Sequence, residues 1–252
     1  MLQEERFAFI LKELAEKGAV KVNTLAEQLH TSQSTVRRDI RELDESGKLR
    51  KVFGGAVALE PSVNTIESDV LTRESRNTAA KDAIARYAAT QINENDFVYI
   101  DAGTTTERII PYIDSSLTGS VYFVTNGIMH ARRLAERGFR VFLPGGVLKA
   151  TTEAIVGAGA MEYIDNCNFT KCFMGTNGVD PSRGFTTPEM DEARIKAQAI
   201  RHSYITYVLC DSSKFDNVSS VSFGKLNCAC IVTDRLPNEI YRNITVIKEV
   251  EA

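Results

Sequence analysis

Residues 33–56 read QSTVRRDIRELDESGKLRKVFGGA, and this stretch decides the fold of the first part of the chain. Val36, Ile40 and Leu43 follow the i, i+4, i+7 spacing of one helical face, which predicts a buried stripe. A rotation of about 100° per residue places four side chains on the opposite side of this helix: Ser34, Arg37, Arg38 and Arg41. The stretch therefore predicts an amphipathic helix that presents a row of guanidinium groups to solvent.

Two further helical patterns precede this helix. Apolar residues recur at helical spacing in residues 2–17, and Gly18 is a plausible helix stop. The segment VNTLAEQL (residues 22–29) also has one apolar face, but a helix of about two turns is not stable alone in water. A polar break follows at residues 30–32, where Thr31 or Ser32 can cap the next helix. A short helix, a polar turn and a longer helix form the helix-turn-helix pattern, in which the second helix reads DNA.

The segment KLRKVFGGAV (residues 48–57) reads as a strand, a turn at Gly54-Gly55 and a return strand, and we call this basic hairpin the wing. Arginine carries forked donors that match guanine edges and phosphate oxygens. The alternative for the arginines is a solvated helix face with i, i+4 pairing, such as Arg38 with Glu42. The candidate DNA-binding residues are Gln33, Ser34, Thr35, Arg37, Arg38, Arg41, Arg50 and Lys51.

Composition limits the class of protein. The 252 residues carry a net charge of −3, so the chain lacks the overall positive charge of a non-specific nucleic-acid coat. No apolar run approaches the roughly 20 residues that span a bilayer, and the first residues have no uninterrupted apolar segment of the secretory kind. These features predict a cytoplasmic protein without membrane contact.

The cysteines do not form a recognisable metal or disulfide pattern. There are five, an odd number, with no C-x-x-C pair. Cys228 and Cys230 could be proposed as a metal pair, but NCACIVT (residues 227–233) reads as a strand with alternating faces. We therefore expect buried free thiols and no metal site.

Residues 58–72 show no sustained period, contain Pro61 and are locally acidic, which predicts a linker. It separates a DNA-binding domain, residues 1–57, from a larger domain, residues 73–252. Residues 72–92 have the composition of a helix. Beyond them apolar runs alternate with helical patterns, as in FVYID and VYFVT, which is typical of an α/β domain with a largely parallel sheet.

Ligands of such sheets bind beyond the carboxyl ends of the strands. The first end, Asp101 to Thr106, reads DAGTTT, where a glycine turn, backbone N–H groups and threonine hydroxyls suit a phosphate, although a simple helix cap is the alternative. The glycine, asparagine and serine residues at the other strand ends could also be explained by turn formation alone. Together these ends supply hydroxyls, amides and lysines suited to a phosphorylated polyol. The candidate effector-binding residues are Asp101, Gly103, Thr104, Thr105, Thr106, Thr125, Asn126, Gly146, Lys149, Asn177, Gly178 and Lys214.

These motifs resemble the DeoR family of bacterial repressors. The resemblance rests on STVRRDI (residues 34–40), Leu43, Gly47, Leu49 and Gly54-Gly55-Ala56, and on the strand ends together with Glu192, Lys196 and DSSKF (residues 211–215). Phe53 departs from the family, which often carries histidine before the paired glycines. The resemblance implies a winged helix-turn-helix followed by an effector domain similar to ribose-phosphate isomerase. It also implies three partners: double-stranded operator DNA, a phosphorylated sugar, and further copies of the chain in a dimer or tetramer.

We therefore expect a transcriptional repressor of a sugar-catabolic operon, released from DNA by a phosphorylated sugar and needing no cofactor. Fructose 1-phosphate is the favoured effector and tagatose 6-phosphate the second. A transcriptional activator would have the same sequence pattern as a repressor. The alternative from another class is a sugar-phosphate isomerase with a DNA-binding module, which needs a carboxylate as general base. Its candidates are Asp101, Asp180, Glu189, Asp191 and Glu192.

Overall fold

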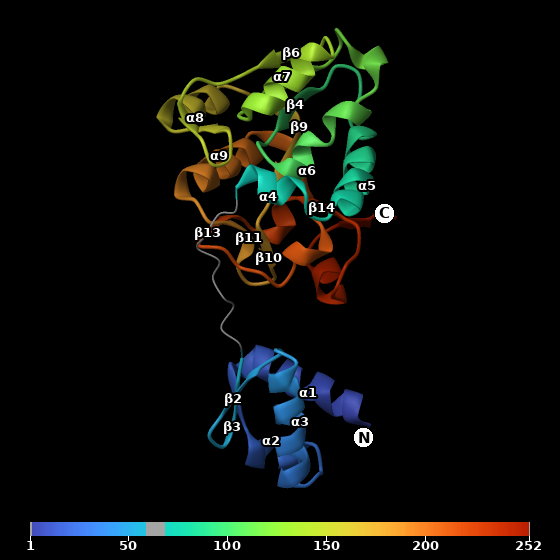
Figure 1. Cartoon of the computed structure of the whole chain (residues 1–252), viewed down its shortest axis with the longest axis vertical. Coiled ribbons are helices and arrows are strands. Elements are labelled where there is room, and N and C mark those ends of the chain that lie inside the picture. The colour runs from blue at the N-terminus through green and yellow to red at the C-terminus, as the bar shows by residue number, and fades with distance from the viewer. Residues whose placement is uncertain (1, 59–68, 252) are drawn as a thin grey trace. The chain divides into compact units, whose positions relative to one another are not determined.

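The computed structural model describes residues 2–58 and 69–251, and the chain divides into two units, residues 1–62 and 63–252 (Figure 1). Each unit has its own hydrophobic core. Most of the predicted linker, including Pro61, lies outside the described residues. Its last residues, however, begin helix α4 (Val70–Glu74), so the prediction of a linker up to residue 72 extends too far.

The N-terminal domain contains the three predicted helices, α1 (Gln3–Lys17), α2 (Val22–Gln28) and α3 (Gln33–Glu45). Ile10, Leu25 and Val36, one from each helix, are fully buried in their shared core. Gly18 ends α1 with a φ of +72°, a left-handed conformation that glycine adopts without strain. The Oγ of Ser32 accepts a hydrogen bond of 3.2 Å from the Thr35 N–H, which confirms an N-cap at this position.

The wing is present and belongs to a three-stranded sheet. Strands β2 (Arg50–Val52) and β3 (Gly55–Val57) form the predicted hairpin, and β1 (Ala19–Lys21), which was not predicted, pairs with the other side of β3. A Cβ at Gly55 would lie 2.0 Å from the Val20 carbonyl oxygen, so only glycine allows this approach. Helix-turn-helix and wing therefore form one packed domain.

A seven-stranded, wholly parallel sheet forms the centre of the larger domain, in the order β15-β14-β12-β9-β4-β5-β6. This confirms the predicted α/β class. The strands in chain order are β4 (Phe97–Ile100), β5 (Tyr122–Thr125), β6 (Arg140–Phe142), β9 (Phe169–Gly175), β12 (Ser203–Leu209), β14 (Cys230–Thr233) and β15 (Ile247–Glu249).

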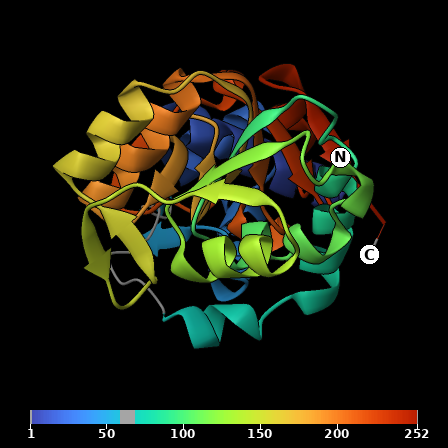
Figure 2. The same cartoon turned by 90° about the horizontal axis from the view of Figure 1, so that it is seen from above.

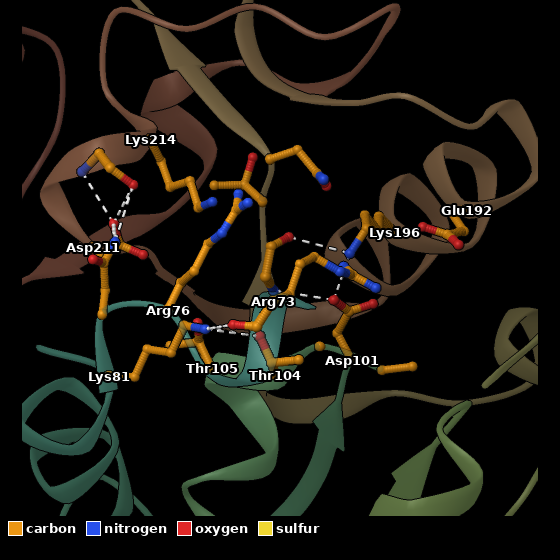
Figure 3. A pocket seen from close by; sticks show the side chains of 17 residues that line it. Arg73, Arg76, Lys81, Asp101, Thr104, Thr105, Glu192, Lys196, Asp211 and Lys214 are labelled. Carbon is orange, nitrogen blue, oxygen red and sulfur yellow. Dashed lines mark hydrogen bonds and ion pairs between the residues drawn. The ribbon is translucent and has the colours of Figure 1, made fainter. Parts of the chain in front are cut away.

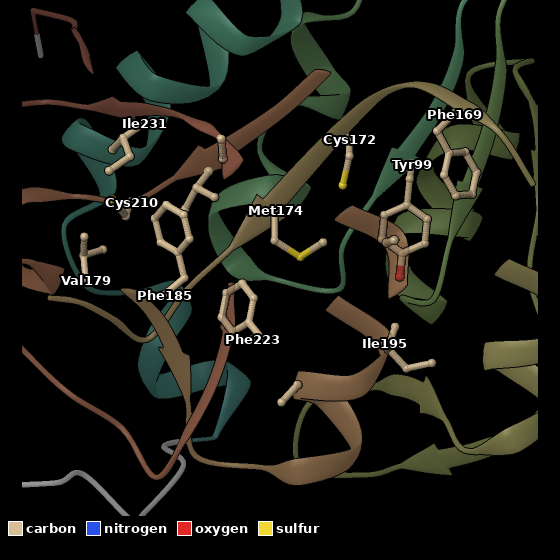
Figure 4. Close-up of a cluster of buried hydrophobic side chains, with 14 of the residues drawn as sticks. Tyr99, Phe169, Cys172, Met174, Val179, Phe185, Ile195, Cys210, Phe223 and Ile231 are labelled. Carbon is tan, nitrogen blue, oxygen red and sulfur yellow. The ribbon is translucent and has the colours of Figure 1, made fainter. Parts of the chain in front are cut away.

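Helices cover both faces of this sheet, as Figure 2 shows. Helices α5 (Thr78–Ala89) and α7 (Ile128–Glu136) pack on one face, and α8 (Ala158–Asp165) and α9 (Met190–Arg201) on the other. Successive strand residues point to opposite faces, so Val98 and Ile100 join the cluster under α5 while Tyr99 joins the cluster under α9 (Figure 4). Both faces are apolar because both are covered.

Smaller elements surround the carboxyl edge of the sheet. They are the one-turn helix α6 (Thr104–Glu107), the hairpin of β7 (Val147–Lys149) and β8 (Ala154–Val156), and an antiparallel sheet of β10 (Gly178–Asp180), β11 (Gly184–Thr187) and β13 (Val221–Gly224). Among the described residues there are also five short 3₁₀ segments: η1 (Ile110–Tyr112), η2 (Ser115–Leu117), η3 (Ser212–Lys214), η4 (Leu226–Cys228) and η5 (Glu239–Asn243).

Two sequence predictions were wrong in detail. Residues 72–92 do not form one helix, because Asn77 takes a left-handed φ of +52° between α4 and α5. Of the cysteines, Cys167, Cys172 and Cys210 are buried, whereas Cys228 is exposed and Cys230 half-buried. The reason is that η4 occupies the start of the predicted strand, which begins only at Cys230.

Within residues 2–58 and 69–251, no helix is long and apolar enough to cross a membrane. The same residues contain no cluster of histidine, cysteine and carboxylate side chains that could hold a metal ion.

Candidate functional site

The first candidate site is the outer face of α3. Arg37, Arg38 and Arg41 are exposed there, together with Gln33 and Ser34, and Thr35 is half-buried. In the described part of the chain none of the three arginines forms an ion pair, and the alternative pairing of Arg38 with Glu42 is absent. Glu42 instead accepts a hydrogen bond of 2.7 Å from Gln3. Arg50 and Lys51 are exposed on the wing. The face therefore keeps its cationic groups available for an anionic partner.

A buried ion pair holds this face in position. The Asp39 carboxylate is 0% exposed and accepts a forked contact from the Arg6 guanidinium, with Nε to Oδ2 at 2.6 Å and Nη2 to Oδ1 at 2.9 Å. In the run Arg37-Arg38-Asp39, the arginines thus point to solvent while the aspartate ties α3 to α1. The role of Asp39 as an anchor for α3 could not be predicted from the sequence, because its partner Arg6 lies 33 residues away.

The second candidate site is a cavity of about 170 Å³ in the larger domain, beyond the carboxyl ends of β4, β9 and β12 (Figure 3). Six predicted effector residues line it: Asp101, Gly103, Thr104, Thr105, Asn177 and Lys214. Other lining residues were not among the predicted binding set: Arg73, Arg76, Asn77, Lys81, Ala102, Gly175, Thr176, Glu192, Lys196, Asp211 and Ser213. The cavity thus joins five separate segments of the chain.

Asp101 and Lys196 form a buried ion pair at one end of the cavity. The Lys196 Nζ also donates to the Gly175 carbonyl at 3.1 Å, and the Gly175 N–H donates to Asp101 Oδ2 at 3.1 Å. These contacts join β4, β9 and α9 at their ends. The charge of Asp101 is therefore compensated within the protein, which a buried carboxylate requires.

Glu192 is the second carboxylate at this end, and it is also paired. It accepts hydrogen bonds from Lys149 at 3.0 Å and from Thr152 at 2.8 Å. Burial alone would raise the pKa of Glu192, but Lys196, Thr152 and Lys149 together lower it. Glu192 is thus held as a carboxylate.

The other end of the cavity is cationic. Lys81 is only 4% exposed, and its Nζ donates to Thr104 Oγ1 at 3.1 Å and to the Arg73 carbonyl. Burial lowers the pKa of Lys81 to about 8. In the described structure, the side chains of Arg76 and Lys214 make no hydrogen bond or ion pair, although both line the cavity. Two cationic groups without a protein partner beside a buried lysine favour an anionic ligand at this end.

Asp211 lies beside this cationic end and has one unsatisfied oxygen. Its Oδ1 accepts from the Asn77 amide at 2.8 Å and from Ser213. Its Oδ2 is buried and lacks a hydrogen-bond partner in the described structure. Buried carboxylate oxygens are normally satisfied, so a donor such as a ligand hydroxyl fits this position.

The remaining predicted effector residues support the cavity and do not line it. Asn126 is fully committed to the protein, because its Oδ1 accepts from the Ala102 N–H and the Tyr99 hydroxyl, both at 3.0 Å, and its Nδ2 donates to Ile155 at 3.2 Å. Thr106 donates to the Asp101 carbonyl at 2.6 Å, and Thr125 accepts from the Gly127 N–H at 3.1 Å. All three hold the loops behind the cavity wall.

Packing explains the two glycines outside the cavity. A Cβ at Gly146 would lie 2.5 Å from the Val156 carbonyl oxygen, and one at Gly178 would lie 2.3 Å from that of Asn217. Lys149 contacts the site indirectly, through its ion pairs with Glu192 and, at 3.6 Å, with Glu189.

Three of the unpredicted cationic residues lie in TRESRNTAAK (residues 72–81): Arg73 in α4, Arg76 between α4 and α5, and Lys81 in the first turn of α5. Arg73 and Arg76 stand three residues apart, which is a signal that the sequence contains. This spacing does not indicate that the two arginines lie beside the cavity, because residues 72–81 come close to the strand ends only in the tertiary fold.

The carboxylates proposed for an isomerase are either paired or elsewhere. Asp101 and Glu192 line the cavity, each in an ion pair with a lysine. Asp180 accepts from the N–H groups of Ser182 and Arg183, both at 2.8 Å, in a surface turn. Glu189 and Asp191 are not among the lining residues. The geometry thus favours binding of a ligand over proton abstraction from it.

Two family models match separate parts of the chain. Residues 6–62 match the model of the DeoR-like helix-turn-helix domain, and residues 76–235 match that of the DeoR C terminal sensor domain. The protein named uncharacterized HTH-type transcriptional regulator FruR from Bacillus subtilis (strain 168) is 39% identical over 254 residues, 100% of each chain. The lactose phosphotransferase system repressor of Staphylococcus aureus (strain N315) is 32% identical over 257 residues, 99% of each chain.

Solved structures that match part of the chain share little sequence with it. Ribose 5 phosphate isomerase A from Neisseria gonorrhoeae is 16% identical, with a TM-score of 0.39 over 56% of this chain and 54% of that one. eIF2B delta from Chaetomium thermophilum is 19% identical, with a TM-score of 0.42 over 58% and 52%. The family matches and the full-length relatives decide the assignment: the chain belongs to the DeoR family, whose members are transcriptional regulators rather than enzymes.

Proposed function

We propose that the chain represses a sugar-catabolic operon and leaves its operator when a phosphorylated sugar fills the cavity of the larger domain. The observation that carries the proposal is the cationic end of that cavity, where Arg76 and Lys214 have no protein partner among the described residues. The name of one relative, lactose phosphotransferase system repressor, supports the regulatory class.

The charges of the cavity support a monophosphate. Five cationic side chains and three carboxylates line it. The excess of two positive charges would balance the two negative charges of one phosphate dianion. The phosphate would lie near Arg76, Lys81 and Lys214. Sugar hydroxyls would then reach Asp211 Oδ2, Asn177 and Thr176, which offer acceptors and an amide donor.

The DNA side of the proposal rests on α3 and the wing. Ser34, Thr35, Arg37, Arg38 and Arg41 would enter the major groove with Gln33, while Arg50 and Lys51 would contact the flanking backbone. Paired reading heads would need a homo-oligomer, a dimer or tetramer, in the cytoplasm. Sedimentation of the purified chain in solution tests this, and a monomer at micromolar concentration would contradict it.

Fructose 1-phosphate is our first choice of effector, and tagatose 6-phosphate the second. Both present one phosphate and several hydroxyls, so they share the chemistry that the cavity supports. A thermal-shift panel with these two compounds, inorganic phosphate and unphosphorylated fructose separates the contribution of the phosphate group to binding from that of the sugar. A ligand at 100 times its Kd adds about 2.7 kcal/mol of stability.

The same compounds are then added to a complex with a duplex that the chain selects from a random library. We expect the stabilising sugar phosphate to release the DNA, and fructose to leave it bound. A panel without any thermal shift would contradict the phosphate site. A shift without release would contradict the regulatory coupling and leave the binding site intact.

A further inference from the structure

The tip of the wing carries a fully exposed aromatic ring. Phe53 makes no packing contact with the hydrophobic core of its domain, and its neighbour Val52 is also exposed. The ring belongs to a two-residue turn between paired Val52 and Gly55. An isolated exposed apolar residue needs no explanation in general. Here, however, hydrogen bonds fix the backbone of the hairpin tip that carries the ring.

Two backbone hydrogen bonds fix the hairpin that presents Phe53. The Val22 N–H, at the start of α2, donates to the Gly54 carbonyl at 2.9 Å. The Lys51 N–H donates to the Asp44 carboxylate, near the end of α3, also at 2.9 Å. Gly54 itself has a φ of +79°, which closes the turn and which few other residues adopt without strain. The tip is therefore positioned relative to the reading helix before any partner binds.

The charges around the ring match one kind of partner. Lys48, Arg50 and Lys51 are exposed on the same wing. The minor groove of duplex DNA has phosphates along its rims, sugars on its walls and base edges on its floor. Apolar side chains that enter this groove beside basic residues can unstack a base step and kink the duplex. An apolar tip flanked by cations fits that surface better than it fits an apolar protein surface.

We propose that Phe53 is a wedge that enters the minor groove next to the segment read by α3, partly unstacks one base step and bends the duplex. The inference rests on the proposed DNA-binding function and adds a contact that reads deformability. Flexible pyrimidine–purine steps, such as TA, are the sequences that a wedge of this kind prefers.

The test uses the full chain and the duplex selected from a random library. Wild type is compared with Phe53→Ala and with Tyr204→Ala, a matched control at an equally exposed aromatic residue of the larger domain. We expect Phe53→Ala to weaken binding about tenfold, the size of one lost aromatic–base contact. Energy transfer between dyes at the duplex ends should report a smaller bend, and 2-aminopurine beside the TA step should lose its fluorescence gain. Tyr204→Ala should change none of these.

Salt dependence separates a wedge from a phosphate contact. Lys51→Ala should reduce the slope of log affinity against log salt by about 1, whereas Phe53→Ala should leave that slope unchanged. Equal affinity and equal bend for Phe53→Ala and wild type would overturn the wedge, and so would a lost affinity without any change in bend. If Phe53→Ala behaves like wild type while Arg38→Ala weakens binding in the same assay, the wedge fails and the DNA-binding function stands. If wild type selects no duplex at all, the proposed function itself fails.

Discussion

In the N-terminal domain, Arg37 and Arg38 lie exposed on one helix, whereas in the larger domain Lys81 and Lys196 are buried at the wall of a cavity. In the proposed function the exposed groups keep their solvation and would meet a large polyanion, so salt would screen their action within a Debye length of about 10 Å at 0.1 M. The buried groups act over short distances in a medium of low dielectric constant, where each must be matched by hydrogen bonds. The proposed function therefore combines two electrostatic designs in one protein, one suited to an extended polymer and one suited to a small anion.

The largest effect should follow from removing Asp39, the buried carboxylate beneath the exposed arginines of α3. Asp39→Ala leaves Arg6 without its forked partner, and because Arg6 is only partly buried we expect a cost of about 3 kcal/mol, the lower end of the range for a buried pair. We expect the unfolding transition of this domain to shift accordingly in urea, with loss of DNA binding. Glu45→Ala, an exposed site at the end of the same helix, is the control and should change stability by less than about 0.5 kcal/mol. Equal stability of the two variants would refute the anchoring role.

Removal of an exposed reading residue should affect binding and not folding. Arg38→Ala should weaken operator binding by about 2 kcal/mol in gel shifts at fixed salt if the guanidinium contacts a base edge. Its melting temperature should stay at the wild-type value, because Arg38 has no ion pair in the described structure. Arg132→Ala, an exposed arginine on α7 that pairs with Glu136, is the matched control. Unchanged affinity for Arg38→Ala would remove this residue from the interface.

In the cavity, Lys214→Met should weaken effector binding about twentyfold, because a hydrogen bond to a charged group is worth about 1.5–3 kcal/mol. Calorimetry with the sugar phosphate that gives the largest thermal shift measures the change. Operator binding without effector should be unaffected, which separates the two sites. Lys225→Met, an exposed lysine outside the cavity, serves as the control. A variant with full effector affinity would place the phosphate elsewhere.

The smallest effect is a pH dependence of effector binding. Burial lowers the pKa of Lys81 to about 8, so its amine loses its proton as the pH rises through that value. A phosphate dianion favours the protonated amine. Effector affinity should therefore fall about tenfold between pH 7 and pH 9, as the protonated fraction falls. Lys81→Met should bind more weakly at pH 7 and show a flat profile over this range. A wild-type profile that is equally flat would exclude Lys81 from the phosphate contacts.

The helix-turn-helix was predictable because its information is local. The period of Val36, Ile40 and Leu43 fixes both the buried stripe of α3 and the outward direction of its arginines, and Ser32 caps the helix within one turn. The family resemblance then made the prediction specific. The parallel sheet was predictable for a similar reason, since alternating apolar runs and helical patterns have few alternative arrangements.

The loops at the strand ends were found for the same topological reason, yet half of the predicted effector residues proved to support the cavity. Sequence distinguishes a threonine or asparagine at a strand end from other residues, but not whether its side chain faces the ligand or the protein. In the sequence, Asn126 and Thr104 are both polar residues just after a strand, and nothing local distinguishes their roles. In the fold Asn126 holds three protein groups, whereas Thr104 lines the cavity.

Local periodicity in the sequence was enough to specify the outer face of α3, the basic wing and the order of strands and helices. The tertiary structure alone brought Arg76 and Lys81 to the strand ends, paired Asp101 with Lys196, and set Arg6 beneath the reading helix. The physical reason is that periodic patterns act over one or two turns of chain. Ion pairs and cavities, in contrast, depend on contacts between segments that are far apart in sequence and meet only after the core has packed.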